Sequence, residues 1–107
     1  MIQSVNPSTG KLIKEYHPHT NEDVLSVIDK VSTEYTKWKT LSFKERSNII
    51  VDIADALGGN IEEHAKMISL EIGKPITESR MEVEKCVWVL KYFAENAEEF
   101  LKSKTIK

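Results

Sequence analysis

A glycine-lysine pair is the first feature of this sequence that could do chemistry. Gly73 and Lys74 precede Pro75 in the segment LEIGKPITES, and such a pair often holds a phosphate. A Walker-type loop also needs a glycine five residues earlier and a Ser or Thr directly after the pair, whereas this chain has Ile68 and Pro75 there. The pattern therefore favours a helix boundary. We expect Gly73 to end one helix in the left-handed conformation and Pro75 to take the first position of the next.

The other candidates for catalysis are weaker. A dinucleotide fingerprint needs three closely spaced glycines after a strand, and the four glycines of this chain are not arranged in that way. Cys86 lies on an apolar helical stripe, and no histidine stands at a helical spacing that could activate its thiol. We therefore predict a buried structural cysteine, and no catalytic or cofactor-binding residue.

Histidines and charged residues give no metal or catalytic cluster by spacing. His17 and His19 with the distant His64 could be considered as metal ligands, but a His-x-His pair in a loop is a weak signal. Glu82 and Lys85 stand three residues apart, and we expect them to pair on the solvent face of a helix.

Composition and charge limit the classes of function. The 107 residues carry 15 Lys and Arg against 17 Asp and Glu, a net charge of −2 with the two signs interspersed. This balance argues against nucleic acid and anionic membranes as partners, and against a helix-turn-helix DNA-binding protein. The amino terminus does not read as a signal peptide, the longest apolar run is far shorter than a membrane span, and a single cysteine suits a reducing compartment. We expect a cytoplasmic protein.

The elements that must position these residues are a hairpin and a series of helices. Strands are predicted at residues 2–5 and 11–16, joined by a turn over residues 6–10, so that residues 1–19 form a hairpin and residues 20–107 are helical. Thr20 with Asp23, and Ser42 with Glu45, form capping boxes. Asn60 is expected to cap a third helix, and a long last helix runs from Pro75 to about residue 102. Apolar stripes follow the helical period; the first comprises Val24, Val27, Ile28, Val31, Tyr35 and Trp38.

One stretch of the last helix is apolar on all sides. Residues 86–90 are consecutive apolar positions, so their side chains face several directions and must be covered on more than one side. A few short helices and a hairpin do not easily provide that cover. The run therefore implies a partner surface, and it keeps open the alternative of a stand-alone helical protein-interaction module.

An ordered set of motifs resembles the aldehyde dehydrogenase superfamily. The set consists of VNPSTGKLI at residues 5–13, Trp38 before FKER at 43–46, ISLEIGKPITES at 68–79, EVEKC at 82–86 and YFAENAEEFL at 92–101. The resemblance covers nearly the whole chain and is greatest to the succinate-semialdehyde dehydrogenase branch. It implies that the chain is mainly α-helical with an amino-terminal β-hairpin and forms the incomplete amino-terminal portion, residues 1–107, of a Rossmann-type α/β cofactor-binding domain.

The resemblance also implies an oxidoreductase that uses NAD or NADP to oxidise an aldehyde, succinate semialdehyde among the candidates. The family's catalytic cysteine, general-base glutamate and cofactor lysine belong to motifs that follow this region, and Cys86 does not match the nucleophile. We therefore expect an amino-terminal fragment that is inactive and binds no cofactor by itself. Its partner is expected to be the rest of the enzyme or a copy of itself, in a homo-oligomer.

One family site can be carried over to this chain. Some family members hold a monovalent cation with backbone carbonyls before the Asn-Pro turn and with the acidic residue of the Leu-Glu-x-Gly-Lys-Pro motif. By resemblance these positions are Ser4, Val5 and Glu71 here. Oxygen ligands suit a hard cation, although the family's site needs a further ligand that this chain lacks. The alternative is that Glu71 only caps or pairs locally.

Overall fold

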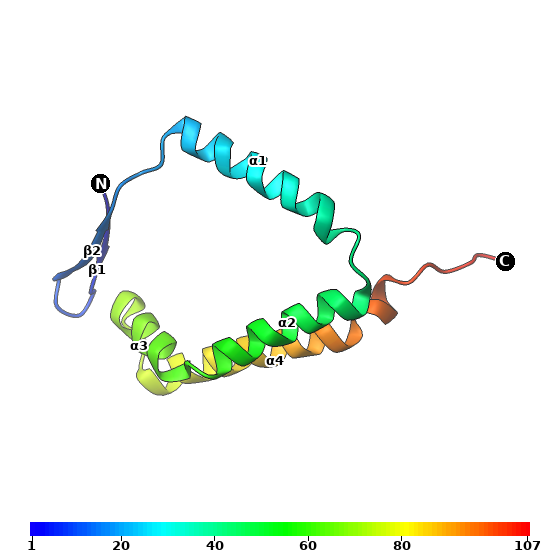
Figure 1. Ribbon diagram of the computed structural model, residues 1–107. Coiled ribbons are helices and arrows are strands. Elements are labelled where there is room, and N and C mark those ends of the chain that lie inside the picture. The colour runs from blue at the N-terminus through cyan, green and yellow to red at the C-terminus, as the bar shows by residue number, and fades with distance from the viewer.

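The computed structural model describes residues 1–107, which form a β-hairpin followed by four helices (Figure 1). The elements are β1 (Ile2–Val5), β2 (Leu12–Tyr16), α1 (Asn21–Trp38), α2 (Phe43–Gly58), α3 (Ile61–Ile72) and α4 (Ile76–Leu101). The predicted fold class, mainly α-helical with an amino-terminal hairpin, is confirmed. None of the helices combines the length and apolar character that a membrane crossing requires.

The hairpin owes its shape to the turn between its strands. β1 and β2 pair antiparallel, with Ile2 opposite Tyr16 and a register shift between Ser4 and Val5. The Asn6 side chain accepts the Ser8 N–H at 2.9 Å, and its carbonyl accepts the Gly10 N–H at 2.8 Å. Gly10 has a φ of 71°, a conformation that glycine adopts without steric cost. Asn6 and Gly10 thus supply the turn chemistry that the sequence indicated.

Two of the helices begin with the predicted capping boxes. The Thr20 hydroxyl accepts the Asp23 N–H at 3.1 Å, and the Asp23 carboxylate accepts the Thr20 N–H at 2.9 Å. Ser42 and Glu45 repeat the arrangement at 3.1 and 2.7 Å. The backbone N–H that each carboxylate accepts holds the pKa of Asp23 and of Glu45 below its ordinary value. Both prediction and structure therefore place the starts of α1 and α2 at the same residues.

Two predicted helix starts need correction. Asn60 does not cap α3, because its side-chain amide donates instead to the Ala56 carbonyl at 3.0 Å. That carbonyl is one of the last four of α2, which have no partner within the helix, and Asn60 is close enough to reach back to it. Pro75 has an extended ψ of 138° and precedes the first residue of α4, so that helix begins one residue later than predicted.

Helix α4 is the element on which α2 and α3 pack. α2 and α4 lie side by side (Figure 1), and the Ser47 hydroxyl donates to the Ala94 carbonyl at 2.7 Å. Since Ser47 is near the start of α2 and Ala94 near the end of α4, the two helices run antiparallel. α3 packs on the first part of α4. The buried residues are all small or medium in size: Ala54, Ala65, Ser79, Val83 and Ala94.

Helix α1 stands apart from the α2–α3–α4 unit (Figure 1). Its predicted apolar stripe is present but uncovered, with Val24 46%, Val31 63% and Tyr35 59% exposed. Only Trp38, at the end of the helix, is half-buried. The stripe is therefore an unpartnered face in this chain.

The whole chain exposes more surface than a closed domain of its size. Its accessible surface is 8823 Å² for 12.2 kDa, against about 6,000 Å² for a compact monomer of that mass. Its radius of gyration of 18.8 Å likewise exceeds the roughly 13 Å of a compact 107-residue domain. The excess, about 2,800 Å², is larger than one partner's share of a standard protein interface. Much apolar surface is therefore exposed in this chain, and cover by other protein stays a prediction from the run at residues 86–90.

The turn between α3 and α4 generates a stability prediction. Gly73 has a φ of 79°, and a Cβ there would lie 3.0 Å from Pro7 Cγ. Gly73→Ala should therefore lower the free energy of unfolding by about 1 kcal/mol or more, because it adds left-handed strain and a clash. Gly10→Ala is the matched control, since Gly10 has a similar φ but no atom within 4 Å of the added Cβ.

Urea denaturation followed by circular dichroism would measure both variants beside Lys74→Ala. Lys74 forms one ion pair at the surface, so its loss should cost less than the loss of Gly73. A larger effect of Lys74→Ala than of Gly73→Ala would contradict the assignment of this turn as a helix boundary.

Candidate functional site

The Gly73-Lys74 turn is a helix boundary in the structure. The Gly73 N–H donates to the Ser69 carbonyl at 3.0 Å, which ends α3 in the left-handed conformation that the sequence predicted. The Lys74 ammonium forms an ion pair with Glu82, which raises the pKa of Lys74. Its charge is therefore directed at a carboxylate on α4.

The partner of Glu82 differs from the prediction. Glu82 pairs with Lys74 rather than with Lys85, which forms no ion pair. The spacing of three residues along α4 permitted the predicted pair. The turn before α4, however, brings Lys74 to the same carboxylate. Helical spacing identifies only partners on the same helix, so it could not predict this pair.

The three positions of the proposed cation site come from two elements that meet. The Ser4 hydroxyl on β1 donates a hydrogen bond to the Glu71 carboxylate near the end of α3, although 67 residues separate them. Val5, the next residue of β1, is 40% exposed. Glu71 forms no ion pair, so its negative charge has no cationic partner within the chain. The partner that Glu71 has in the structure, Ser4, is close in space but distant in sequence.

The hairpin turn lies directly beside the α3–α4 turn. The ring of Pro7 lies so close to Gly73 that a Cβ added there would be 3.0 Å from Pro7 Cγ, closer than an ordinary contact. The Asn-Pro turn and the Leu-Glu-x-Gly-Lys-Pro segment, two separate motifs in the sequence, are thus one contact in space. This contact fixes the end of β1 against the end of α3, and with it the spacing of Ser4 and Glu71.

Two polar contacts between α3 and α4 were missed by sequence reasoning. Arg80 donates to both carboxylate oxygens of Glu62, at 2.7 and 3.1 Å, and this raises the pKa of Arg80 and lowers that of Glu62. The hydroxyls of Ser69 and Ser79 lie 2.8 Å apart, and Ser79 is completely buried. The sequence does indicate that Ser79 is buried, because Ser79 lies four residues before Val83 and therefore on the same side of α4. No sequence pattern pointed to Arg80 and Glu62.

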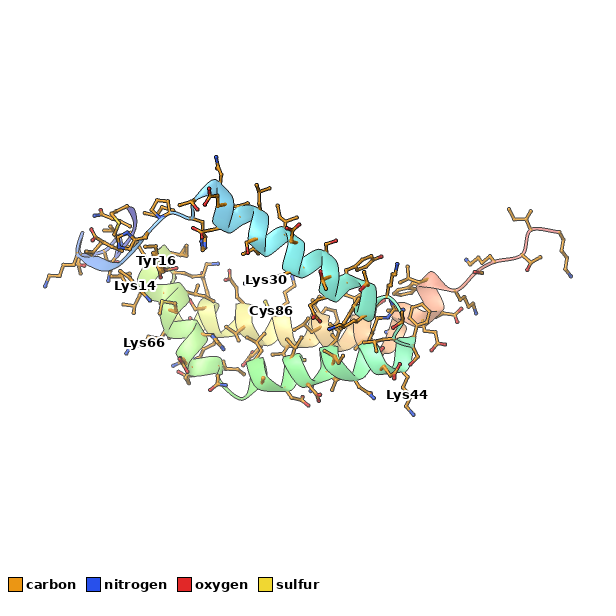
Figure 2. All side chains as sticks on the ribbon, turned by 45° about the horizontal axis from the view of Figure 1, so that its top comes forward. Lys14, Tyr16, Lys30, Lys44, Lys66 and Cys86 are labelled. Carbon is orange, nitrogen blue, oxygen red and sulfur yellow. The ribbon has the colours of Figure 1, made fainter.

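Cys86 is exposed, so the prediction that it is buried is wrong (Figure 2). It faces an open groove of about 370 Å³ between α3 and α4, whose lining includes His64 and Met67. The groove is open because nothing packs over the uncovered sides of these helices. The Cys86 thiol makes no hydrogen bond with His64 or any other residue. It therefore lacks the paired base that an activated nucleophile needs.

The histidines and acidic residues do not form a metal centre. No group of three or more His, Cys, Asp and Glu side chains lies close enough to hold a metal ion through side chains alone. His17 and His19 follow β2, whereas His64 lies on α3. The features that the structure does assemble are the hairpin contact at Glu71 and the uncovered apolar faces of the helices.

Comparison with known sequences identifies the scaffold. The model of the aldehyde dehydrogenase family matches residues 1–107. A probable NADP(+) succinate-semialdehyde dehydrogenase of Synechocystis sp. is 30% identical over 105 residues, which are 98% of this chain and 23% of that protein. An NADP(+) succinate-semialdehyde dehydrogenase of Mycobacterium tuberculosis is 31% identical over 100 residues, 94% of this chain and 22% of that protein.

Solved structures agree with the sequence matches. Succinic semialdehyde dehydrogenase of Streptococcus pyogenes, in complex with NADP+, superposes with a TM-score of 0.91 at 25% identity, over 98% of this chain and 23% of that one. Glyceraldehyde-3-phosphate dehydrogenase of Methanocaldococcus jannaschii, complexed with NADP, gives a TM-score of 0.90 at 28% identity, over 100% of this chain and 23% of that one. The chain thus spans less than a quarter of the length of these relatives. Since the family model matches every residue from 1 to 107, the chain belongs to the aldehyde dehydrogenase family.

Proposed function

We propose that residues 1–107 form the amino-terminal part of the cofactor-binding domain of an NAD(P)-dependent enzyme that oxidises succinate semialdehyde to succinate. The observation that carries this proposal is the superposition on an NADP+-bound succinic semialdehyde dehydrogenase over 98% of the chain. Two relatives of 30 and 31% identity bear the same activity in their names, with NADP as the cofactor. NAD remains the alternative cofactor.

Within such an enzyme, this segment acts as a scaffold. Oxidation of an aldehyde by this family requires a nucleophilic cysteine, a base and a nicotinamide that accepts hydride. The one thiol here, Cys86, has no hydrogen-bonded base, and the glycines at 10 and 73 serve turns. What the segment offers is apolar surface: the stripe of α1 and the uncovered sides of α2 and α4 would pack on the remaining fold. The uncovered surface equally favours the second candidate, a stand-alone helical interaction module.

A chimera tests the proposal. Residues 1–107 would replace the matching 23% of the Synechocystis relative, and oxidation of succinate semialdehyde with NADP would be measured. We expect kcat/KM within about tenfold of the parent, a difference of roughly 1.4 kcal/mol in transition-state stabilisation, because the segment supplies the same packing surfaces. A chimera on the M. jannaschii enzyme, assayed with its own substrate, is the control and should retain a smaller fraction of its parent's activity. A folded Synechocystis chimera without dehydrogenase activity would contradict the proposal. The stand-alone interaction module would then be the favoured function.

The purified 107-residue chain should neither oxidise succinate semialdehyde nor bind a dinucleotide. The reason is the lack of a glycine fingerprint and of an activated nucleophile. Calorimetric titration with NAD and with NADP checks this, beside an absorbance assay at the nicotinamide band. Dissociation constants below about 100 μM, or roughly 5.5 kcal/mol of binding free energy, would show that the segment holds a cofactor by itself.

We also propose that Ser4, Val5 and Glu71 contribute to a monovalent cation site in the complete enzyme. The unpaired charge of Glu71 and its contact with β1 support this, because a hard cation prefers carboxylate and carbonyl oxygens. The carbonyls of Ser4 and Val5 and the Glu71 carboxylate would hold the ion together with a ligand from outside this chain.

The cation site predicts a salt-specific stabilisation of the Synechocystis chimera. Raising sodium or potassium to about ten times its dissociation constant should stabilise the folded protein by roughly 1.4 kcal/mol. Glu71→Gln should abolish the resulting shift in melting temperature, because it removes the anionic ligand. Glu63→Gln, an exposed acid on α3 without an ion pair, is the matched control. Equal shifts in the Glu71→Gln and parent proteins would rule the site out.

A further inference from the structure

Helix α1 does not pack on α2, although the connection between them is short enough to allow it. α1 ends at Trp38 and α2 begins at Phe43, so four residues join the two helices. A connection of this length is typical of two antiparallel helices that pack on each other. In the structure α1 stands away from α2 and α4 instead (Figure 1), and its apolar stripe stays exposed. Some other contact therefore holds α1 in this position.

The α2–α4 pair offers an apolar surface for α1. A groove of about 290 Å³ lies between the two helices, and most of the residues that line it are apolar. They include Phe43 and Ile50 of α2 and Leu90, Phe93 and Leu101 of α4. Since Phe43 is the residue at which the connection from α1 enters α2, the groove begins beside that connection. The stripe of α1 and the groove are thus two apolar surfaces within reach of each other.

Charge also favours α1 on this groove. Arg46 lines the groove, forms no ion pair, and lies with its guanidinium 4.7 Å from the centroid of the Phe43 ring. Glu34 lies four residues before the end of α1, and Arg46 lies three residues after the start of α2. An antiparallel α1 would therefore bring the Glu34 carboxylate close to the guanidinium. The present partner of Glu34 is Lys37 on the same exposed helix, and such pairs contribute little.

The other end of α1 is tied to the hairpin by a short link. Four residues, 17–20, join β2 to α1, and they span at most about 13 Å. Pro18 fixes its own φ and favours extended backbone at His17, and Thr20 is extended with a ψ of 164°. The link is therefore stiff, and the start of α1 is placed by the position of the hairpin.

The hairpin, in turn, is held by α3 and the turn that follows it. The Ser4 hydroxyl donates to the Glu71 carboxylate, and the Pro7 ring lies against Gly73. These two interactions are here called the strut contact. The hairpin, α1, α2 and α3 follow one another along the chain, and the strut contact closes them into a ring (Figure 1). It is the one non-covalent joint of this ring, so its loss would free α1 to turn about residues 39–42.

We propose that the hairpin is a strut, which holds α1 away from the α2–α4 groove through the strut contact. Loss of the contact lets α1 fold onto the groove. The strut keeps both apolar surfaces available to the remaining fold of the enzyme, and this functional consequence rests on the proposed function. The position of α1 depends only on contacts within residues 1–107. It is therefore measurable in the purified chain, whatever the activity of the Synechocystis chimera.

A reducible disulfide tests the strut within a single protein. A Cβ at position 73 would lie 3.9 Å from the Cβ of Pro7, which is within the range for a disulfide. The test variant carries Pro7→Cys and Gly73→Cys, with Ser4→Ala to remove the hydrogen bond and Cys86→Ser to remove the other thiol. When the variant is oxidised, the disulfide replaces the strut contact. When it is reduced, both natural interactions are missing.

Small-angle X-ray scattering, extrapolated to zero concentration, measures the position of α1. The wild type and the oxidised variant should keep a radius of gyration near 18.8 Å. Reduction should shorten that radius by several ångströms, toward the roughly 13 Å of a compact domain of this length, because α1 then packs on α2 and α4. Gln3→Ala is the matched control, since it removes a hydrogen bond to Glu15 within the hairpin and leaves the strut contact intact. It should keep the wild-type radius.

Hydrogen exchange distinguishes folding back of α1 from its unfolding. On reduction the amide protons of α1 should exchange at least about tenfold more slowly, because the helix gains cover, and circular dichroism should show unchanged helix content. A wild type that is already compact, or an oxidised variant that contracts, would overturn the proposal, because α1 would then close with the strut in place. A reduced variant that stays extended, or that loses the helix of α1, would overturn it as well.

Discussion

The close approach of α2 and α3 to α4 is the contact on which the remaining structure depends. Small side chains at the crossings, Ala54, Ala65, Ser79 and Ala94, let the helix backbones come near one another. Polar contacts complete the unit, because Ser79 and Ser69 satisfy each other and Arg80 holds Glu62 at the edge. This arrangement buries little apolar surface, because the side chains of alanine and serine are small. The helices hold together, but they do not enclose the apolar residues on their other sides.

The hairpin reaches this unit through one further contact. Pro7 in the hairpin turn lies against Gly73 in the α3–α4 turn, and Ser4 bonds to Glu71. The Asn-Pro turn and the Leu-Glu-x-Gly-Lys-Pro segment are therefore the two segments that join β1 to the helices. Two features favour glycine at 73, its left-handed backbone and the close approach of Pro7. The glycine of the Gly-Lys pair therefore serves the contact between the hairpin and the helices, as the helix boundary predicted from the sequence allows.

Local features of this fold could be read from the sequence. The capping boxes at Thr20 and Ser42 and the left-handed Gly73 depend on residues within a few positions of one another, and these predictions are confirmed. Features that depend on distant segments could not. Cys86 stands on a stripe that looked buried, but whether a stripe is covered depends on what lies across from it. The partners of Glu82 and Glu62 come from other segments of the chain. Only the family resemblance placed Ser4 and Glu71 in one site. Asn60 lies between the end of α2 and the start of α3, and the sequence alone did not show with which of them its side chain would form a hydrogen bond.

Helix α1 shows what the open arrangement means for the motions of the chain. Its 18 residues form backbone hydrogen bonds among themselves, yet no other helix packs on the apolar stripe. An isolated helix of this length is marginally stable in water, because tertiary packing normally supplies most of the stability of a protein helix. The amide protons of α1 should therefore exchange with solvent much faster than those in the middle of α4, which α2 covers. The chain would then consist of one cooperative unit and one helix that opens independently, and any partner that covers the α1 stripe would slow that exchange first.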